Sequence, residues 1–254
     1  MYDLVKLAAV AVVFLAAQMA GGPNPRQAGA GEPPPLELVV QDFEGTAADG
    51  RWDIHRYPGD SGDFEYSVRP DALVMIDKEN RNQNLTRRGL ELDPNGRYAV
   101  EARFRIDEPE GAPPPNSFCV NFLVAGAEGE LDSISCWSVN LTVQPVEGAR
   151  GMMLYMGFID GKFKNIGRRT VDWCKTNTEY LFRVEVNTDL AGRHKPKMVT
   201  VTIKEGESVR ERFEVDYSAF PFQPDYSGPV RVGVNSHGAD WTMHSFKVYA
   251  DRSP

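Results

Sequence analysis

Histidine and cysteine are scarce in this sequence. Its 254 residues include 4 histidines and 3 cysteines. None of the histidines has the i, i+4 spacing that places two zinc ligands on one face of a helix. An odd number of cysteines cannot all be joined in disulfides within one chain. We therefore expect no histidine-based metal centre and at most one disulfide.

Basic clusters are also missing. The formal net charge is −8, and no basic run is longer than the pairs Arg87-Arg88 and Arg168-Arg169. A nucleic-acid surface needs clustered Lys and Arg to neutralise phosphates. We therefore expect no nucleic-acid partner. A neutral polysaccharide agrees with this charge, whereas an acidic glycan would require arginines to gather locally against the global charge.

The sequence also lacks a sustained apolar period of 3.6 residues, so we expect no long helix. Short runs instead alternate between apolar and polar residues, and turn signals such as Pro94-Asn95-Gly96 separate them. The expected strands cover residues 36–40, 64–68, 72–76, 98–106, 118–124, 134–143, 152–158, 180–186, 198–203, 212–215, 230–234 and 244–248. Strands at this spacing predict a β-sandwich or barrel.

The N-terminus contains an apolar run, LAAVAVVFLAA at residues 7–17, which follows Lys6. This run is shorter than the about 20 apolar residues of a membrane-spanning helix, and it fits a signal peptide. We expect a signal peptide at 1–20, a Pro/Gly-rich linker at 21–35 and a single domain at 36–252. The expected location is secreted, periplasmic or cell-surface, with no stable membrane span after cleavage. An uncleaved anchor is the alternative.

Alternation predicts which side of each strand is buried. In 98–106 the apolar residues alternate with Glu101, Arg103 and Arg105, so the apolar side is expected to be core. In 117–124 and 134–143 the polar side carries Asn, Ser and Thr rather than a mixture of Lys and Glu. Amides and hydroxyls can exchange hydrogen bonds with sugar hydroxyls, which predicts a sugar-binding trough. An ordinary polar outer face is the alternative. The expected ligand-binding residues are Asn121, Asn140, Thr142, Tyr155 and Arg103.

Several of these segments resemble the concanavalin A-like lectin and glucanase superfamily, including its laminin G-like members. The resemblance rests on strand patterns at 180–186, 199–203, 228–234 and 246–248, with 42–44 and 100–105 in the first half. It implies an all-β, two-sheet antiparallel jelly-roll sandwich. It also implies a polysaccharide or oligosaccharide as partner.

The segment from Gly129 to Ser135 resembles the active-site strand of the laminarinase and agarase family. Glu130 and Asp132 match two of the three carboxylates of that strand, but Ser135 stands where the third is expected. Retaining hydrolysis needs one carboxyl group to attack and a second to protonate the leaving oxygen. A serine cannot donate that proton at neutral pH. We therefore expect no intact hydrolase motif, and a polar hairpin turn is the simpler interpretation of this segment.

An enzyme remains the alternative function. Arg103 and Tyr155 resemble the residues with which alginate-lyase-like sandwiches neutralise a uronate and transfer protons, and His237 lies in a turn where it could act with them. Polysaccharide lyase and glycoside hydrolase activity on an extracellular polysaccharide are therefore both retained as alternatives, as is a structural adhesion module. The preferred prediction is an exported carbohydrate-binding or glycan-associated β-sandwich.

Two structural predictions complete the sequence analysis. Sandwiches of this family often carry a calcium ion that joins the first and last strands, and Asp42, Glu44 and Asp240 are the candidate ligands. Cys119 and Cys136 lie on strands expected to be neighbours, so they are predicted to form a disulfide while Cys174 stays free. Ordinary solvated carboxylates and three reduced core cysteines are the respective alternatives.

Overall fold

The computed structural model describes residues 35–44, 51–56, 65–76, 82–93, 96–107, 116–124, 135–143, 151–159, 162–187, 198–216, 230–237 and 240–251. The regular elements in these ranges are fifteen β-strands. None of these ranges contains a helix that could cross a membrane. The expected signal peptide and nearly all of the expected linker lie outside the described residues.

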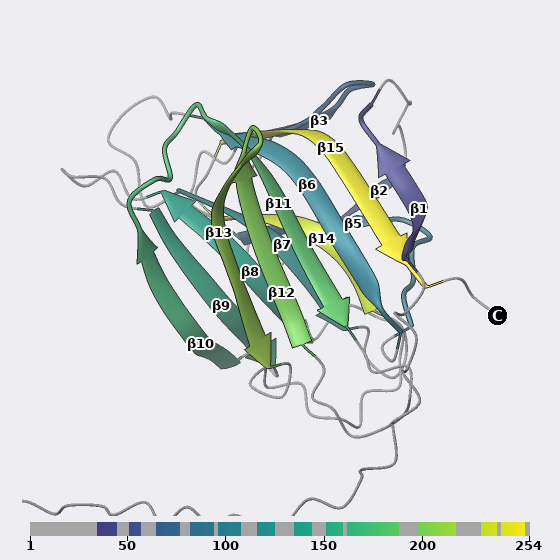
Figure 1. Ribbon diagram of the computed structural model, residues 1–254. Helices are drawn as coiled ribbons and strands as arrows, with labels where there is room; N and C mark the ends of the chain where they lie inside the picture. Colours follow the sequence, from purple (N-terminus) through teal and green to yellow (C-terminus); the bar gives the residue numbers. More distant parts are fainter. Residues whose placement is uncertain are drawn as a thin grey trace, which may run out of the picture. The chain divides into compact units, whose positions relative to one another are not determined.

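The strands form two antiparallel sheets, which appear as two layers in Figure 1. The eight-stranded sheet contains, in spatial order, β13 (Ser208–Asp216), β12 (Met198–Glu205), β11 (Glu179–Asn187), β6 (Tyr98–Ile106), β15 (Trp241–Ala250), β4 (Leu73–Ile76) and β3 (Glu65–Val68), and β1 (Glu37–Asp42) also pairs with β15. The seven-stranded sheet contains β10 (Lys162–Val171), β9 (Gly151–Ile159), β8 (Ser135–Val143), β7 (Asn116–Val124), β14 (Val230–His237), β5 (Asn82–Arg87) and β2 (Trp52–Arg56). The predicted all-β, two-sheet antiparallel sandwich is confirmed.

The core fills the space between the sheets. On β6 the predicted inward residues Val100, Phe104 and Ile106 are fully buried, whereas Arg103 on the other side is exposed. The ring of Phe104 stacks on that of Phe118 from the opposite sheet, with the ring centroids 3.7 Å apart. Burial of such side chains contributes about 1.5–3 kcal/mol each and is the main force that holds the two sheets together.

Three tryptophans belong to this core. Trp52 and Trp241 are buried, and Trp173 packs against the buried cluster. Trp52 contacts both Phe43 and Phe246, which seals the β1 side of the sandwich. These rings are therefore used in packing the core.

The cysteine register contradicts the predicted disulfide. Cys119 lies opposite Asn140, and Cys136 lies opposite Leu123. The two cysteines are thus offset by four residues along neighbouring strands, or about 13 Å at 3.3 Å per residue. A disulfide needs Cα atoms about 4.4–6.8 Å apart. The predicted Cys119–Cys136 bridge is wrong, because the two strands pair in a different register from the one expected.

Cys174 is a free and buried thiol, as expected. Burial raises the pKa of this thiol to about 12, so it stays protonated at neutral pH. The same burial raises the pKa of the neighbouring Tyr180 hydroxyl to about 12. That hydroxyl accepts a hydrogen bond from the Lys175 amide at 3.0 Å and donates one to the Trp173 carbonyl at 3.1 Å. Both groups stabilise the turn before β11 rather than offering a reactive centre.

Candidate functional site: the outer face of the seven-stranded sheet

Buried residues on three adjacent strands identify the two sides of the seven-stranded sheet. Val232 and Val234 of β14, Leu85 of β5, and Phe118 and Val120 of β7 all belong to the core. Successive residues of a strand alternate between the two sides of a sheet. The positions between these core residues therefore lie on the side away from the core, which we call the outer face. Gly233 and its partner Thr86, which belong to this face by register, are themselves buried.

The strand register places one residue from each of four adjacent strands in a single row of the outer face. Three of these residues are asparagines and one is a cysteine. Asn235 of β14 lies opposite Asn84 of β5 on one side and Cys119 of β7 on the other. Cys119 lies opposite Asn140 of β8. We call Asn84, Asn235, Cys119 and Asn140 the amide row. Neighbouring strands are about 4.8 Å apart, so the row extends across about 15 Å of sheet.

Two further polar rows flank the amide row. In one, Asn121 lies opposite Gly233 of β14 and Ser138 of β8. In the other, Ser117 of β7 lies opposite His237 of β14 and Thr142 of β8. The expected ligand-binding residues Asn121, Asn140 and Thr142 therefore share the outer face, and so does the candidate His237.

β5 and β14 also contribute polar positions to this face, which the sequence did not indicate. Asn82 and Asn84 lie on β5, and Asn235 lies on β14. The alternation of Asn82, Asn84 and Thr86 around Leu85 was the available signal, but a segment with so few apolar residues does not stand out as a strand. Only the spatial order of strands adds these positions to those of β7 and β8.

Other predicted site residues do not join this face. Tyr155 of β9 lies opposite Val139, which lies opposite the buried Val120, so the register assigns it to a core row. Arg103 lies on β6 in the eight-stranded sheet, where its guanidinium pairs with Glu179 at 3.1 Å. The candidates Glu130 and Asp132 lie outside the described residues.

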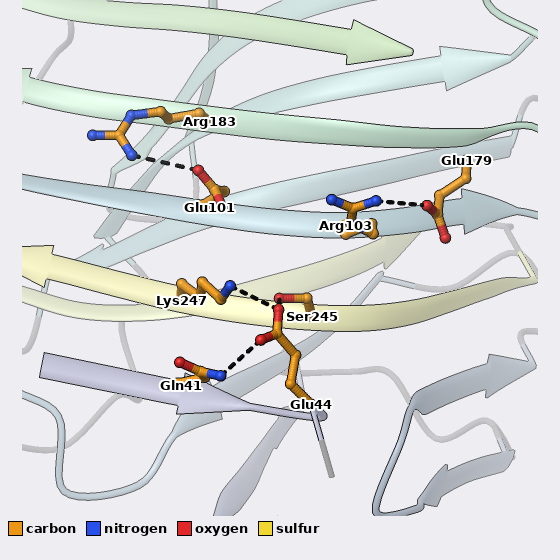
Figure 2. A network of polar contacts seen from close by, with 8 residues as sticks. All are labelled: Gln41, Glu44, Glu101, Arg103, Glu179, Arg183, Ser245 and Lys247. Carbon is orange, nitrogen blue, oxygen red and sulfur yellow. Dashed lines mark hydrogen bonds and ion pairs between the residues drawn. The ribbon is translucent and has the colours of Figure 1, made fainter. Parts of the chain in front are cut away.

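The outer side of the eight-stranded sheet has a different chemical character, shown in Figure 2. Cross-strand ion pairs join Arg103 to Glu179 at 3.1 Å and Arg183 to Glu101 at 3.4 Å. Arg183 and Glu101 face one another directly, whereas Arg103 reaches Glu179 diagonally. Such exposed pairs are common on the solvent side of a sheet and contribute little stability. Within the part of the chain that the structure describes, this side is a ladder of opposite charges rather than a surface of amides.

His244 lies where the alternation of inward and outward residues along β15 is interrupted. His244 shares the sequence phase of Phe246 and Val248, which predicts an inward position. The register of β15 against β6 shifts between Met243 and Ser245, so His244 is the extra residue of a β-bulge and is half-exposed. The predicted inward position is wrong because the bulge changes the phase of the strand.

The three carboxylates expected to hold calcium are not brought together. Asp42 is fully buried, and its two oxygens accept from Nε and Nη2 of Arg87 at 2.5 and 3.3 Å. Glu44 accepts from Lys247 and Ser245, and these contacts, with the Lys247 hydrogen bond largest, hold the pKa of Glu44 below its usual range. Asp240 precedes β15, about 20 Å along that strand from the partner of Asp42.

These donors therefore do not fit a calcium site. A guanidinium group supplies the positive charge beside Asp42, and an ammonium group supplies it beside Glu44. No group of three His, Cys, Asp or Glu side chains that could hold a metal ion occurs among the residues described. Arg87 of one sheet and Lys247 of the other therefore bind the two carboxylates at the end of β1.

Comparisons with known proteins identify the fold. No protein-family model and no curated protein matches the sequence. The carbohydrate recognition domain of Emp46p, in its potassium-bound form, matches with a TM-score of 0.54 at 13% identity, covering 84% of this chain and 95% of that one. The exoplasmic/lumenal domain of VIP36, in its Ca2+/Man3GlcNAc-bound form, matches with a TM-score of 0.52 at 10% identity, covering 80% and 85%.

A third similar structure comes from a phage. The CBM2 module of the evolved Dit of Lactobacillus casei BL23 phage J-1 matches with a TM-score of 0.54 at 9% identity, covering 86% of this chain and 98% of that one. At such low identities these likenesses establish the fold alone. The chain has the concanavalin A-like sandwich fold that its strand patterns predicted.

Proposed function

We propose that this protein is exported and binds a polysaccharide or oligosaccharide through the outer face of its seven-stranded sheet. The observation that carries the proposal is the amide row, which spans four adjacent strands. An asparagine offers both a donor and an acceptor, as does each sugar hydroxyl. A row of such positions therefore matches an extended, hydroxyl-rich chain better than it matches an apolar or cationic ligand.

The fold and the sequence give further support. The similar domain of Emp46p is a carbohydrate recognition domain, and that of VIP36 was solved with Man3GlcNAc and Ca2+. The VIP36 domain is exoplasmic or lumenal. Export of the present protein is supported by the apolar run at residues 7–17, which fits a signal peptide.

Binding without hydrolysis or elimination is favoured over an enzyme. Ser135 replaces the carboxylate that the hydrolase motif needs. The lyase candidates Arg103 and His237 belong to different sheets, and Arg103 is engaged by Glu179. A lyase would need its neutralising arginine and its proton-transferring group around the same sugar carbon. This arrangement therefore argues against the lyase alternative.

We expect Asn140→Ala and Asn235→Ala to weaken glycan binding by roughly fivefold to tenfold each, because each change removes hydrogen bonds worth about 1 kcal/mol. The midpoint of thermal unfolding should stay nearly unchanged, since an amide that serves binding rather than core packing contributes little to stability. Affinity electrophoresis in gels that contain laminarin, xylan, alginate or a glycosaminoglycan would first identify a retarding glycan and then rank the variants.

Thr202→Ala is the matched control, because Thr202 is a half-exposed polar residue on β12 in the other sheet. It should leave retardation unchanged. Absence of retardation by every glycan in the panel would contradict the proposed function. A large loss of thermal stability in the asparagine variants, with retardation intact, would contradict the assignment of these residues to a binding face.

A further inference from the structure

Two arginines lie at one end of the outer face, beyond the row that contains Asn121. Arg231 of β14 lies between the buried Val230 and Val232, which assigns it to the outer face. Arg88 directly follows β5, and its side chain is 61% exposed. Gly233 lies opposite Thr86, and β14 and β5 run antiparallel. Arg231, two residues before Gly233, is therefore level with Arg88, two residues after Thr86.

Each arginine is oriented by a carboxylate beside it. Arg88 donates from Nε to Asp53 Oδ1 at 2.8 Å and makes a second, shorter contact to the same oxygen from Nη2. Arg231 donates from Nη2 to Glu91 Oε1 at 3.3 Å. A guanidinium has five N–H donors in a fixed fork, so the two contacts of Arg88 and the one of Arg231 do not exhaust their capacity to bind an anion.

Arginines gather at this end although the whole chain is acidic. Arg51 and Arg87 both interact with Asp42, which is fully buried. Arg87 is in phase with the core residue Leu85, so its pair with Asp42 lies on the core side of the sheet. On the outer face Arg88 and Arg231 each meet one carboxylate, Asp53 and Glu91. Recognition of an acidic glycan requires arginines that gather in one place against the global charge of −8, and these arginines do so.

The distance between the arginines and the amide row suits a single extended ligand. Arg231 is two residues from Gly233 and four from Asn235 along β14, or about 7 and 13 Å. A glycan that lies along the strands would pass over Gly233 and Thr86, which are themselves buried, to meet asparagine positions with its hydroxyls and the arginines with an anionic group. Arg binds carboxylates in a bidentate, charge-assisted manner that Lys or an amide does not reproduce.

We propose that the outer face selects a glycan that carries carboxylates, of the uronic-acid class, and that Arg88 and Arg231 are the residues that read the charge. This inference rests on the proposed function, because it names the ligand class of the same face. It assigns the amide row to the sugar hydroxyls and the two arginines to the acid group.

Isothermal titration with hexagalacturonate, and with the same hexamer after chemical reduction of its carboxyl groups to alcohols, tests this inference. We expect the wild-type protein to bind the acidic hexamer about tenfold more tightly than the reduced one. Arg88→Gln and Arg231→Gln should each remove most of this preference while leaving the affinity for the reduced hexamer unchanged. Higher salt should weaken binding of the acidic hexamer alone.

Arg103→Gln is the matched control, because Arg103 is a half-exposed arginine paired with one glutamate, on the other sheet. It should behave like the wild type. Arg88→Lys should recover only part of the preference, because a lysine keeps the charge but loses the fork. Circular dichroism of each variant would establish that it is folded.

The outcomes separate the two proposals. Equal affinity for both hexamers, or a preference that survives in both glutamine variants, would overturn the inference and leave the proposed function intact. Loss of the preference in Arg103→Gln would also overturn it, because the charge would then be read on the other sheet. If neither hexamer and no glycan of the electrophoresis panel bound, the proposed function would fail and the inference would fall with it.

Discussion

Replacing Asp42 with alanine is expected to lower the free energy of unfolding by about 3–4 kcal/mol. The Asp42 side chain is fully buried and that of Arg87 is 11% exposed, so the change strands a guanidinium without its carboxylate. The loss of one partner of a buried ion pair is costly because the remaining charge cannot recover its hydration. Urea unfolding followed by tryptophan fluorescence would measure the effect.

Glu179→Ala provides the control, because Glu179 forms an ion pair of the same chemical type, with Arg103, in which both side chains are about half exposed. Such a pair is worth about 0–1 kcal/mol. The double variant Asp42→Ala/Arg87→Met should be more stable than Asp42→Ala alone, since it removes the stranded charge. Equal losses in the two alanine variants would show that the Asp42 contact does not hold β1.

Replacing Gly233 with alanine is expected to cost about 3 kcal/mol, at the upper end of the range for overpacking. A Cβ atom at this position would lie 2.1 Å from the Leu85 carbonyl oxygen and 3.0 Å from the Thr86 Cα. Both atoms belong to the backbone of β5, which cannot move away without breaking its ladder with β14. Since β5 and β14 each carry part of the amide row, the variant should lose glycan binding together with stability.

Gly96→Ala is the matched control, because the nearest atoms to its Cβ would be 3.4 Å away, an ordinary contact. Thermal unfolding of both variants, measured by circular dichroism, should separate them clearly. If Gly233→Ala unfolded at the wild-type temperature, β5 and β14 could not approach one another as closely as the structure has them.

Apolar alternation was sufficient to predict most of the strands. Residues 98–106 were expected as a strand and form β6 with those bounds, because four apolar residues in phase are difficult to bury in any other way. The polar strands β2, β5 and β10 were missed. β5 has a single apolar residue, Leu85, whose side chain belongs to the core. One apolar residue gives almost no periodicity signal, and pairing with β14 stabilises the strand instead.

Strand order and register could not be predicted, because both depend on contacts between segments far apart in the chain. Nothing local indicates that β14 lies between β7 and β5, which is what assembles the amide row. Nothing local offsets Cys136 from Cys119 by four residues either. A one-residue error in register moves every side chain to the other side of the sheet, so predicted faces hold within a strand better than between strands.

The segment 42–44 shows the same limit at a single turn. Phe43 has a φ of 71°, in the left-handed region that a bulky residue rarely adopts. Because of this turn, three successive side chains point to different places. Asp42 pairs with Arg87 of one sheet, and Phe43 packs on Trp52 in the core. Glu44 pairs with Lys247 of the other sheet. Sequence alone indicated two carboxylates close to each other, for which a shared metal ion was the natural hypothesis.

The face that contacts the glycan is the central claim, and NMR chemical-shift mapping tests it most directly. Backbone amides of deuterated, 15N-labelled protein would be followed during titration with an oligomer of whichever polysaccharide retards the protein most. The account predicts that the largest shifts fall in β5, β7, β8 and β14, which carry the amide row. Shifts confined to β6, β11 and β15, whose outer side carries the charged ladder, would contradict it.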